Sequence, residues 1–398
     1  MSREKIRIVG GGAAAIAFAL FIDTSLFEVE LLEKEKTLGR KFLVAGKGGF
    51  NLTHGSSPLE MLSHYLPSEW MTPYFDSFTN VDFQVYLKSI GIDTFIGSSN
   101  RVFPIKEIKP YQVLGTMLSI IQKIGIKVSC NTPWTGFAGL KKRNEGNGDD
   151  KGLCIFALGG ASWMKTGSDG LWQKHFCNEG IQVNPFLPSN CGWEIGAAIK
   201  WTQTLAGVPL KNIEVYHGEN RVKGELRITD YGLEGGCIYQ LSPNLRKQYL
   251  DEGSATIEVD FKPSKNEASI YQLLSQSNKS ASETLKSKVK LSKAAVQIIK
   301  QTLDKETFTD PKQLSALIKR FPIVLQNPRP IDEAISTVGG VDRSELDDNL
   351  QLIKLPKHYC IGEMIDWDAP TGGYLLQACF SMGYYLAKHL NEEYRERD

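Results

Sequence analysis

The stretch VGGGAAAIAFAL, residues 9–20, places three glycines directly before a run of small and apolar residues. Residues 6–9 predict a short buried strand, and residues 13–21 predict a helix that begins at the glycines. A second strand is expected at residues 28–33. A strand, a helix and a second strand in this order form a βαβ unit, which predicts a parallel sheet and an α/β fold.

The glycines in this turn match the dinucleotide-binding fingerprint, with alanine at the third position. Gly10 permits the tight turn, Gly12 lets a pyrophosphate approach the backbone, and Ala15 lets the helix pack closely on the sheet. The start of the helix offers free N–H groups to phosphates. Glu33, at the end of the second strand, can accept hydrogen bonds from an adenosine ribose. The alternative is a glycine-rich turn followed by an exposed glutamate.

The segment GRKFLVAGKGGFNLTH, residues 39–54, favours FAD over NAD as the bound dinucleotide. Arg40 and Lys41 bring positive charge near a diphosphate, and Gly46 begins a group of glycines that leaves backbone amides open. A nicotinamide domain normally continues into another helix and strand at this point. A long loop instead indicates contact along an extended cofactor, although a surface loop has the same composition.

The C-terminal stretch CIGEMIDWDAPTGGYLLQACFSMGYYLA, residues 360–387, predicts a strand that ends at Ile361 and a helix over residues 373–392. A carboxylate at Glu363 is suited to ribityl hydroxyls, and the helix N-terminus favours negative charge at a flavin pyrimidine edge. An ordinary Gly-capped core helix is the alternative. Residues 134–140 and 153–158 predict two further strands. Gly160, after the second of these strands, marks either a close approach to the cofactor or a plain turn.

Composition excludes several other classes of protein. The chain has 398 residues and a formal net charge of +1, so no overall charge draws it to nucleic acid or to an anionic membrane. None of the seven cysteines forms a C-x-x-C pair, so no metal site is predicted. With no secretory signal and no apolar run of membrane-spanning length, we expect a soluble cytoplasmic protein.

Seven segments together resemble the BaiN/RdsA family of NAD(P)/FAD-dependent oxidoreductases, also labelled HI-type flavoproteins and including aminoacetone-oxidase-like members. The segments are IVGGGAAA, LLEKEKTLGRKFLVAGKGGFNLTH, NRVFPIKEIKP, FALGGASWMKTGSDG, ITDYGLEGG, ISTVGGV and GEMIDWDAPTGGYLLQACFSMGY. The resemblance implies a discontinuous Rossmann-like FAD-binding domain, residues 1–187 and 322–398. It also implies an antiparallel β-barrel-like insertion, residues 188–263, which carries a helical insertion, residues 264–321.

The resemblance also implies a set of FAD contacts. They are Gly10, Gly12, Ala15, Glu33, Lys34, Arg40, Lys41, Gly46, Asn51, Gly160, Gly362, Glu363, Asp366, Gly373 and Tyr374. The family loop has an arginine and a cysteine before the asparagine, whereas this chain has Gly49 and Phe50. Chemistry that depends on that cysteine is therefore absent.

The expected function is an FAD-dependent oxidoreductase that transfers a hydride between the flavin and a small-molecule substrate. NAD(P)H, the substrate itself or a partner protein are the open choices of electron donor. No catalytic residue is assigned, and His54 is only a candidate proton donor. The family also suggests ribosomal RNA uridine reduction, for which residues 279–320 carry ten Lys/Arg against four Asp/Glu. A solvated helical face is the alternative for this basic segment. For the protein as a whole, an amine oxidase, a flavin-binding sensor and a flavin-free NAD dehydrogenase are the other open functions.

Overall fold

The computed structural model describes residues 3–44, 50–97, 99–137, 152–196 and 199–397. The chain divides into two compact units: one comprises Met1–Leu187 and Ser336–Asp398, and the other comprises Pro188–Ile335. Each unit has a hydrophobic core of its own. The first unit is thus built from the two ends of the chain.

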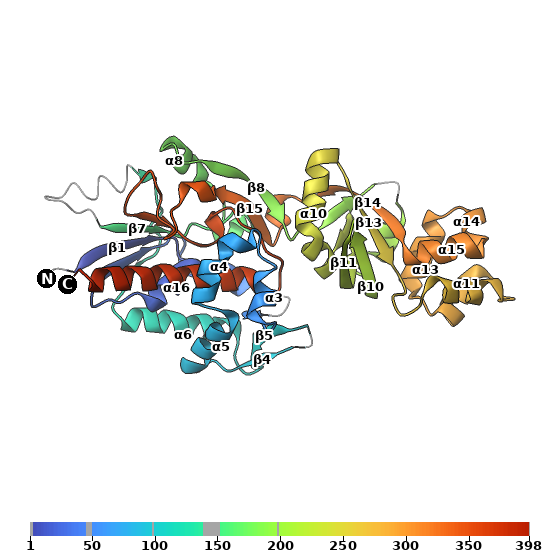
Figure 1. Ribbon diagram of the computed structural model, residues 1–398, viewed down its shortest axis with the longest axis horizontal. Coiled ribbons are helices and arrows are strands. Elements are labelled where there is room, and N and C mark those ends of the chain that lie inside the picture. Colours follow the sequence, from blue (N-terminus) through green and yellow to red (C-terminus); the bar gives the residue numbers. More distant parts are fainter. Residues whose placement is uncertain (1–2, 45–49, 98, 138–151, 197–198, 398) are drawn as a thin grey trace. The chain divides into compact units, whose positions relative to one another are not determined.

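A five-stranded parallel sheet forms the centre of the first unit, in the order β16-β7-β1-β2-β6. The fingerprint turn connects β1 to α1. Strand β7 lies next to β1 in Figure 1, and the C-terminal strand β16 pairs with β7 at the edge of the sheet. These elements are β1 (Glu4–Val9), α1 (Ala13–Phe21), β2 (Phe27–Leu32), β6 (Lys127–Ser129), β7 (Leu153–Phe156) and β16 (His358–Cys360).

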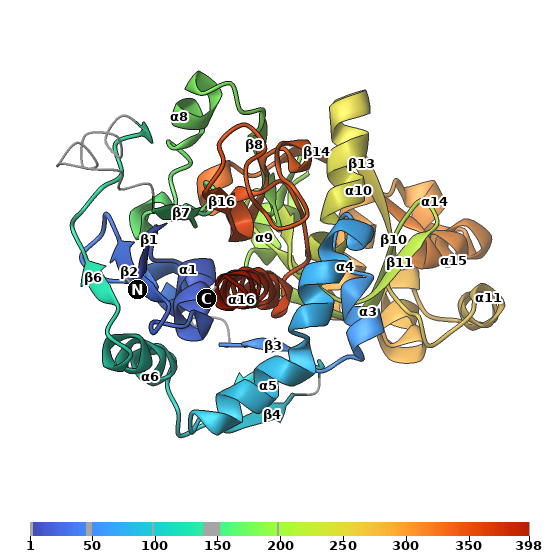
Figure 2. The same ribbon diagram turned by 60° about the vertical axis from the view of Figure 1, so that its left-hand side comes forward.

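The C-terminal helix α16 (Tyr374–Arg395) packs along α1, beside which it lies in Figure 2. The two helices approach closely at Gly383, where an added Cβ would lie 2.7 Å from the Ala17 Cβ and 2.7 Å from the Phe18 nitrogen. Any side chain at Gly383 would push the helices apart. Because Gly383 has no side chain, α16 can pack directly against α1 of the N-terminal βαβ unit.

The remaining elements of the first unit surround this sheet and helix pair. A small antiparallel sheet has the order β3-β5-β4, and β15 pairs with β8. The elements are α2 (Arg40–Val44), β3 (Thr53–His54), α3 (Pro58–Leu62), α4 (Ser68–Ser77), α5 (Asn80–Ser89), β4 (Thr94–Ile96), β5 (Arg101–Pro104), α6 (Pro110–Lys123), η2 (Met164–Thr166), α8 (Gln173–Asn178), β8 (Val183–Ser189), β15 (Ser336–Val341), η5 (Arg343–Glu345) and η6 (Gly362–Met364).

The second unit contains a closed antiparallel barrel in the order β10-β11-β12-β9-β14-β13, which confirms the predicted barrel-like insertion. Its elements are β9 (Trp193–Ile195), α9 (Trp201–Leu205), β10 (Pro209–His217), β11 (Asn220–Ile228), β12 (Gly232–Glu234), α10 (Gly236–Glu252), β13 (Ala255–Asp260), β14 (Phe321–Pro328) and η4 (Ile331–Glu333). Side chains on β13 alternate between buried and partly exposed, as expected for a strand with one face on the core.

Residues 322–335 belong to the barrel unit, whereas the sequence analysis assigned them to the cofactor domain. The reason is that β14 pairs with both β13 and β9 and so closes the barrel. A strand reached only after a helical segment of about sixty residues gives no local sign of which sheet it joins.

Helices fill the segment between β13 and β14, as the family resemblance implied for residues 264–321. They are α11 (Glu267–Ser275), α12 (Ala281–Thr284), the single π-helical turn η3 (Leu285–Val289), α13 (Lys293–Thr302), α14 (Lys305–Thr309) and α15 (Pro311–Lys319). Apolar side chains of this segment, such as Ile270 and Ile299, are buried in the core of the second unit.

The strand predicted over residues 134–140 is wrong for its described part. Residues 134–136 have no regular structure, and residues 138–151 lie outside the described ranges. Trp134 and Phe137 pack edge-on against Phe156 and Phe176, so their apolar character serves core packing instead of strand pairing. Among the described residues, no helix has both the length and the apolar character needed to cross a membrane.

Candidate cofactor and active site

The turn between β1 and α1 has the geometry that the fingerprint predicts. Gly10 has φ +101°, and an added Cβ there would lie 2.4 Å from the Ala157 carbonyl oxygen of the neighbouring strand. Gly12 is the N-cap of α1, and a Cβ on it would meet nothing within 4 Å. Ala15, in the first turn of α1, is fully buried. The space above Gly12 is thus open, next to the amides of the first helical turn.

Glu33 lies one residue beyond the end of β2 and is tied to this turn. Its carboxylate accepts hydrogen bonds from the backbone N–H of Gly11, at 2.6 Å, and from that of Glu35, at 2.8 Å. Burial raises the pKa of Glu33, although the bond from Gly11 favours the ionised form. A carboxylate offers about four acceptor positions. Glu33 can therefore order the glycine turn and still accept a hydrogen bond from a ribose.

Four chain segments meet around Glu363, which follows β16. Its Oε2 lies 2.8 Å from the Lys41 Nζ, and that ammonium group also donates to the Ser162 hydroxyl at 2.8 Å. The Thr337 N–H donates to the Glu363 Oε1 at 3.4 Å. Residues from both ends of the chain, which the sequence analysis grouped by resemblance, are here in direct contact.

Glycines hold these segments close to α1 and to one another. An added Cβ on Gly362 would lie 2.6 Å from the Ala14 Cβ in the first turn of α1. One on Gly160 would lie 2.1 Å from the Thr337 hydroxyl oxygen. Gly160 is thus required by protein packing.

The other two basic residues of the predicted set are paired on the same side of the fingerprint turn. The Lys34 Nζ lies 2.6 Å from the Asp169 carboxylate. The Arg40 guanidinium is ion-paired with Glu35 and donates to the Lys165 carbonyl at 3.0 Å. These pairs fasten the loop over residues 161–172 to the end of β2.

Asp366 is also engaged within the protein. Its Oδ1 accepts the Gly339 N–H at 3.0 Å, and its Oδ2 accepts the Asn184 side-chain amide at 2.8 Å. Arg343 donates to the Asp366 backbone carbonyl. The carboxylate therefore joins β15 and β8 to the loop that leads into α16.

The start of α16 is built against β3 from the other end of the chain. Gly373 has φ +104°, and an added Cβ would lie 2.4 Å from the Thr53 carbonyl carbon. One turn later, the Gln377 Oε1 accepts from the Thr53 hydroxyl at 2.7 Å, and its amide donates to the Phe78 carbonyl at 3.0 Å. These contacts fix the backbone of Thr53 and His54 at the N-terminus of α16.

Tyr374, the first residue of α16, is the centre of an aromatic cluster. His54 stacks on its ring at 5.1 Å between centroids, and His64 packs edge-on, also at 5.1 Å. Tyr65 is fully buried, and its hydroxyl donates to the Tyr374 carbonyl at 2.9 Å. Burial raises the pKa of Tyr374 to about 12 and lowers the pKa of His54. Both groups are therefore held in their neutral forms near pH 7.

Two predicted positions follow α2 in the sequence. Gly46 lies outside the described residues. Asn51 precedes Leu52, whose N–H donates to the Val102 carbonyl of β5 at 2.8 Å. Phe50, in place of the family cysteine, is buried and packs edge-on against Phe42.

Sequence reasoning missed Ser162, Thr337, Tyr65 and Arg101, all of which contact or adjoin predicted residues. Ser162 and Thr337 lie in the quoted family segments FALGGASWMKTGSDG and ISTVGGV, so the motifs gave their approximate positions. Tyr65 lies outside every motif. Its role depends on a contact with a residue more than three hundred positions away, for which the sequence carries no local signal.

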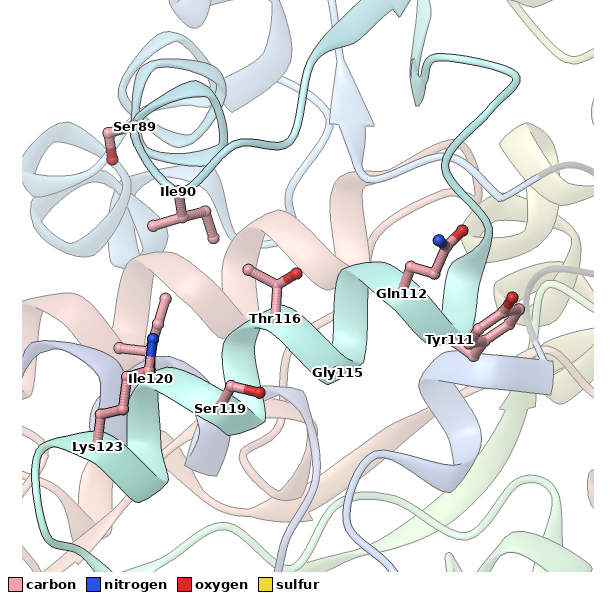
Figure 3. Close-up of a pocket in the computed structure, with 9 residues that line it drawn as sticks. All are labelled: Ser89, Ile90, Tyr111, Gln112, Gly115, Thr116, Ser119, Ile120 and Lys123. Atoms are coloured by element: carbon pink, nitrogen blue, oxygen red, sulfur yellow. The ribbon is translucent and has the colours of Figure 1, made fainter.

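A surface groove between the end of α5 and the exposed face of α6 is separate from this set (Figure 3). None of its lining residues is a predicted cofactor contact. They are Ser89, Ile90, Tyr111, Gln112, Gly115, Thr116, Ser119, Ile120 and Lys123. Within the described ranges, no group of three or more His, Cys, Asp or Glu side chains is arranged to hold a metal ion.

A parallel sheet whose first strand leads through an open glycine turn into a helix, with a carboxylate after the second strand, defines a dinucleotide-binding protein of the Rossmann type. The sequence profile of the HI0933-like protein Rossmann domain matches residues 4–389. The chain therefore belongs to the HI0933-like family, and it is an FAD-binding flavoprotein and an oxidoreductase.

Two relatives align with nearly the whole chain. A 3-dehydro-bile acid delta(4,6)-reductase from Clostridium scindens is 21% identical over 97% of this chain and 98% of its own length. A ribosomal RNA dihydrouridine synthase from Escherichia coli is 24% identical over 98% of each chain. Among solved structures, a 3-ketosteroid-delta4-(5alpha)-dehydrogenase from Rhodococcus jostii is similar with a TM-score of 0.47 and 13% identity, covering 97% of this chain and 96% of that one.

Proposed function

We propose that this flavoprotein reduces a carbon–carbon double bond conjugated to a carbonyl group in a small-molecule substrate. The support comes from the chemistry that the two relatives' names share. A delta(4,6)-reductase acts on ring double bonds of a 3-dehydro compound, and a dihydrouridine is a uridine whose ring double bond has been saturated. Both substrates present a C=C bond polarised by a carbonyl group.

The observation that carries the flavin part of this proposal is the joining of the two chain ends around one open turn. Gly12 leaves room for a diphosphate at the start of α1, and Glu33 is available to the ribose beside it. Lys41 and Glu363 would lie along the middle of the cofactor, and Gly373 and Tyr374 at its flavin end. Bound FAD supplies hydride chemistry. The chain's own residues bind it, orient it and position the substrate.

The test uses the purified holoprotein, reduced with dithionite without oxygen and then mixed with ring enones such as cyclohex-2-en-1-one. We expect the flavin absorbance near its visible maximum to recover as the enone is reduced. Cyclohexanone, which has the carbonyl but no conjugated double bond, is the matched control. Recovery that is no faster with any enone than with cyclohexanone would contradict the proposed reaction.

The same absorbance identifies the electron donor, for which NADH and NADPH are our proposal. Anaerobic addition of either nucleotide to the oxidised holoprotein should bleach the flavin. If neither nucleotide bleaches the flavin, the electron donor is the substrate itself or a partner protein. Because all seven cysteines occur as free thiols, we also expect a reducing compartment, the cytoplasm.

Uridine in ribosomal RNA is the second candidate substrate, because curated relatives in Escherichia coli and Haemophilus influenzae carry that activity in their names. Four exposed lysines support it: Lys286, Lys288, Lys290 and Lys293, around η3 and the start of α13. Other basic residues of the segment are already paired, Lys319 with Asp260 and Arg320 with Glu258.

Binding to a ribosomal RNA fragment should weaken steeply with rising salt if these lysines contact phosphates. Changing Lys288 and Lys290 to glutamate should then weaken binding, while the same change at Lys106 and Lys109, in the other unit, serves as the control. Binding that is absent or insensitive to salt would remove this candidate.

A further inference from the structure

We propose that Tyr374 is a catalytic residue that donates the proton in the reduction of the double bond. This inference rests on the proposed function, because it assigns the source of the second hydrogen added to the substrate. The tyrosine begins α16, where a flavin pyrimidine edge is expected, and the surrounding contacts leave its hydroxyl free to act.

The ring of Tyr374 is fixed on several sides. Only 5% of the residue is exposed, His54 covers one face, and the edges of His64 and Tyr65 complete its surroundings. The Tyr65 hydroxyl also holds the Tyr374 carbonyl, at 2.9 Å. A donor held in one place loses little freedom when the reaction occurs, which is a requirement for efficient proton transfer.

The hydroxyl of Tyr374 differs from that of its neighbour Tyr65. Within the described part of the chain no group hydrogen-bonds to the Tyr374 hydroxyl, and its oxygen is not among the fully buried polar atoms without a partner. Tyr65, fully buried, uses its hydroxyl to support backbone. One tyrosine of the pair is structural, and the other presents an unused hydroxyl.

The charges around Tyr374 suit a proton donor. Burial raises the pKa of its hydroxyl to about 12, so the proton stays on the oxygen until it is transferred, and its release requires a nearby positive charge. Arg101 favours the ionised phenol, whereas Glu60 opposes it. The Arg101 Nε is near the start of α16, 3.4 Å from where a Cβ on Gly372 would lie. Arg101 can therefore stabilise the phenolate that remains after the proton has left.

The step balances in atoms and electrons. Bound reduced FAD would supply a hydride to the carbon β to the carbonyl group, and the π bond of the alkene would break. Its electron pair forms the second C–H bond, at the α carbon, with the proton from the Tyr374 hydroxyl. Water then returns a proton to the phenolate, and the substrate gains two hydrogen atoms.

The first test compares Tyr374→Phe with wild-type holoprotein in the reaction of dithionite-reduced flavin with cyclohex-2-en-1-one. We expect reoxidation by the enone, measured per bound flavin so that any change in FAD content is removed, to be about 100-fold slower or more. Tyr385→Phe is the matched control, because its hydroxyl lies on the same helix and donates to the Asp348 carbonyl. Equal reoxidation rates in Tyr374→Phe and wild type would overturn the proposal.

The pH dependence separates Tyr374 from His54, Glu60 and His64, the other titratable groups around the start of α16. With the phenol as donor, enone reduction should be level between about pH 6 and pH 9 and should show a solvent deuterium isotope effect. Arg101→Gln should slow the reduction and leave FAD content unchanged. A rate that falls as the pH rises through the histidine range, and that His54→Asn abolishes, would transfer the role to His54 and overturn the proposal.

A readout without turnover keeps the two proposals distinguishable. Protein labelled with carbon-13 at the tyrosine hydroxyl carbon should show one resonance that Tyr374→Phe removes. Cyclohex-2-en-1-one added to the oxidised holoprotein should shift this resonance and leave that of Tyr385 in place. A wild-type protein that reduces no enone contradicts the proposed function, whereas an unshifted Tyr374 resonance contradicts the role of Tyr374.

Discussion

Two glycine turns lead into the two helices that pack against each other in the first unit, and their surroundings are opposite. At the start of α1, a Cβ on Gly12 would meet nothing within 4 Å. At the start of α16, a Cβ on Gly373 would lie 2.4 Å from the Thr53 backbone. The first turn is open toward a ligand, and the second is closed by a distant part of the chain.

The difference shows that glycine serves two purposes in one site. Gly12 leaves a space that a ligand can enter, so glycine at this position contributes to ligand binding and not to the stability of the fold. Gly373 lets two backbones touch, and its positive φ adds a second reason for glycine. Substitutions at the two turns should therefore separate loss of binding from loss of stability.

The largest effect is expected for Gly373→Ala. The backbone conformation is unfavourable for alanine, and the Cβ would collide with Thr53, so the free energy of unfolding should fall by about 3 kcal/mol or more. Thermal or urea unfolding measures the change. Gly91→Ala is the control, since Gly91 also has positive φ, +81°, but an added Cβ meets nothing within 4 Å. Equal losses in both variants would show that the contact with Thr53 contributes nothing.

Gly12→Ala should weaken FAD binding and leave the stability of the apoprotein almost unchanged. Its φ of −80° is open to any residue and the Cβ has space, so apoprotein stability should stay within about 0.5 kcal/mol of wild type. FAD affinity should fall about tenfold or more, because the methyl group enters the space proposed for the diphosphate. Equilibrium binding of FAD to the apoprotein, followed by flavin fluorescence, checks this. Unchanged affinity would place the diphosphate elsewhere.

A smaller effect is expected for Lys41→Met, which breaks the ion pair that joins the two chain ends, between helix α2 and Glu363 after the end of β16. The Glu363 side chain, 15% exposed, would lose its cation, and stability should fall by about 1 kcal/mol. Lys34→Met is the control, because its pair with Asp169 is more exposed and should contribute less. Urea midpoints of the two variants decide the order, and a larger loss in Lys34→Met would reverse this interpretation.

The smallest effect is expected for the pH dependence of stability and involves His54, which stacks on Tyr374 next to the Gly373 turn. Burial lowers the pKa of His54, so the unfolded chain binds the proton more readily than the folded protein. Stability should therefore decline as the pH falls below the pKa of an unfolded histidine, about 6.5. His54→Asn should remove part of this decline and leave stability near pH 8 almost unchanged. Identical pH profiles of the urea midpoint would contradict the burial of a neutral imidazole.

Local sequence patterns were sufficient for the elements around the first turn. The spacing from Gly10 to Glu33 predicted β1, α1 and β2 in order, because the contacts within a βαβ unit join residues close in the chain. The same spacing gave the position of Glu33, although its bond to the Gly11 N–H was not foreseen.

Patterns were insufficient where pairing depends on partners far along the chain. The membership of β14 in the barrel, and the edge packing of Trp134 in place of a strand, follow from neighbours that periodicity does not name. The resemblance identified Tyr374 as a position of interest, but the stacking of His54 and the support from Tyr65 required coordinates.

The resemblance to a known family implied the antiparallel β insertion with its helical segment. The sequence pattern by itself determined the glycine turn for a dinucleotide after the first strand and the long helix that follows residue 373. Residue spacing carries this information because helices, strands and tight turns are formed by near neighbours. Only the tertiary structure decided which turn stays open, which is closed by Thr53, and which tyrosine keeps a free hydroxyl. Those outcomes depend on contacts between chain segments hundreds of residues apart, which form only when the cores pack.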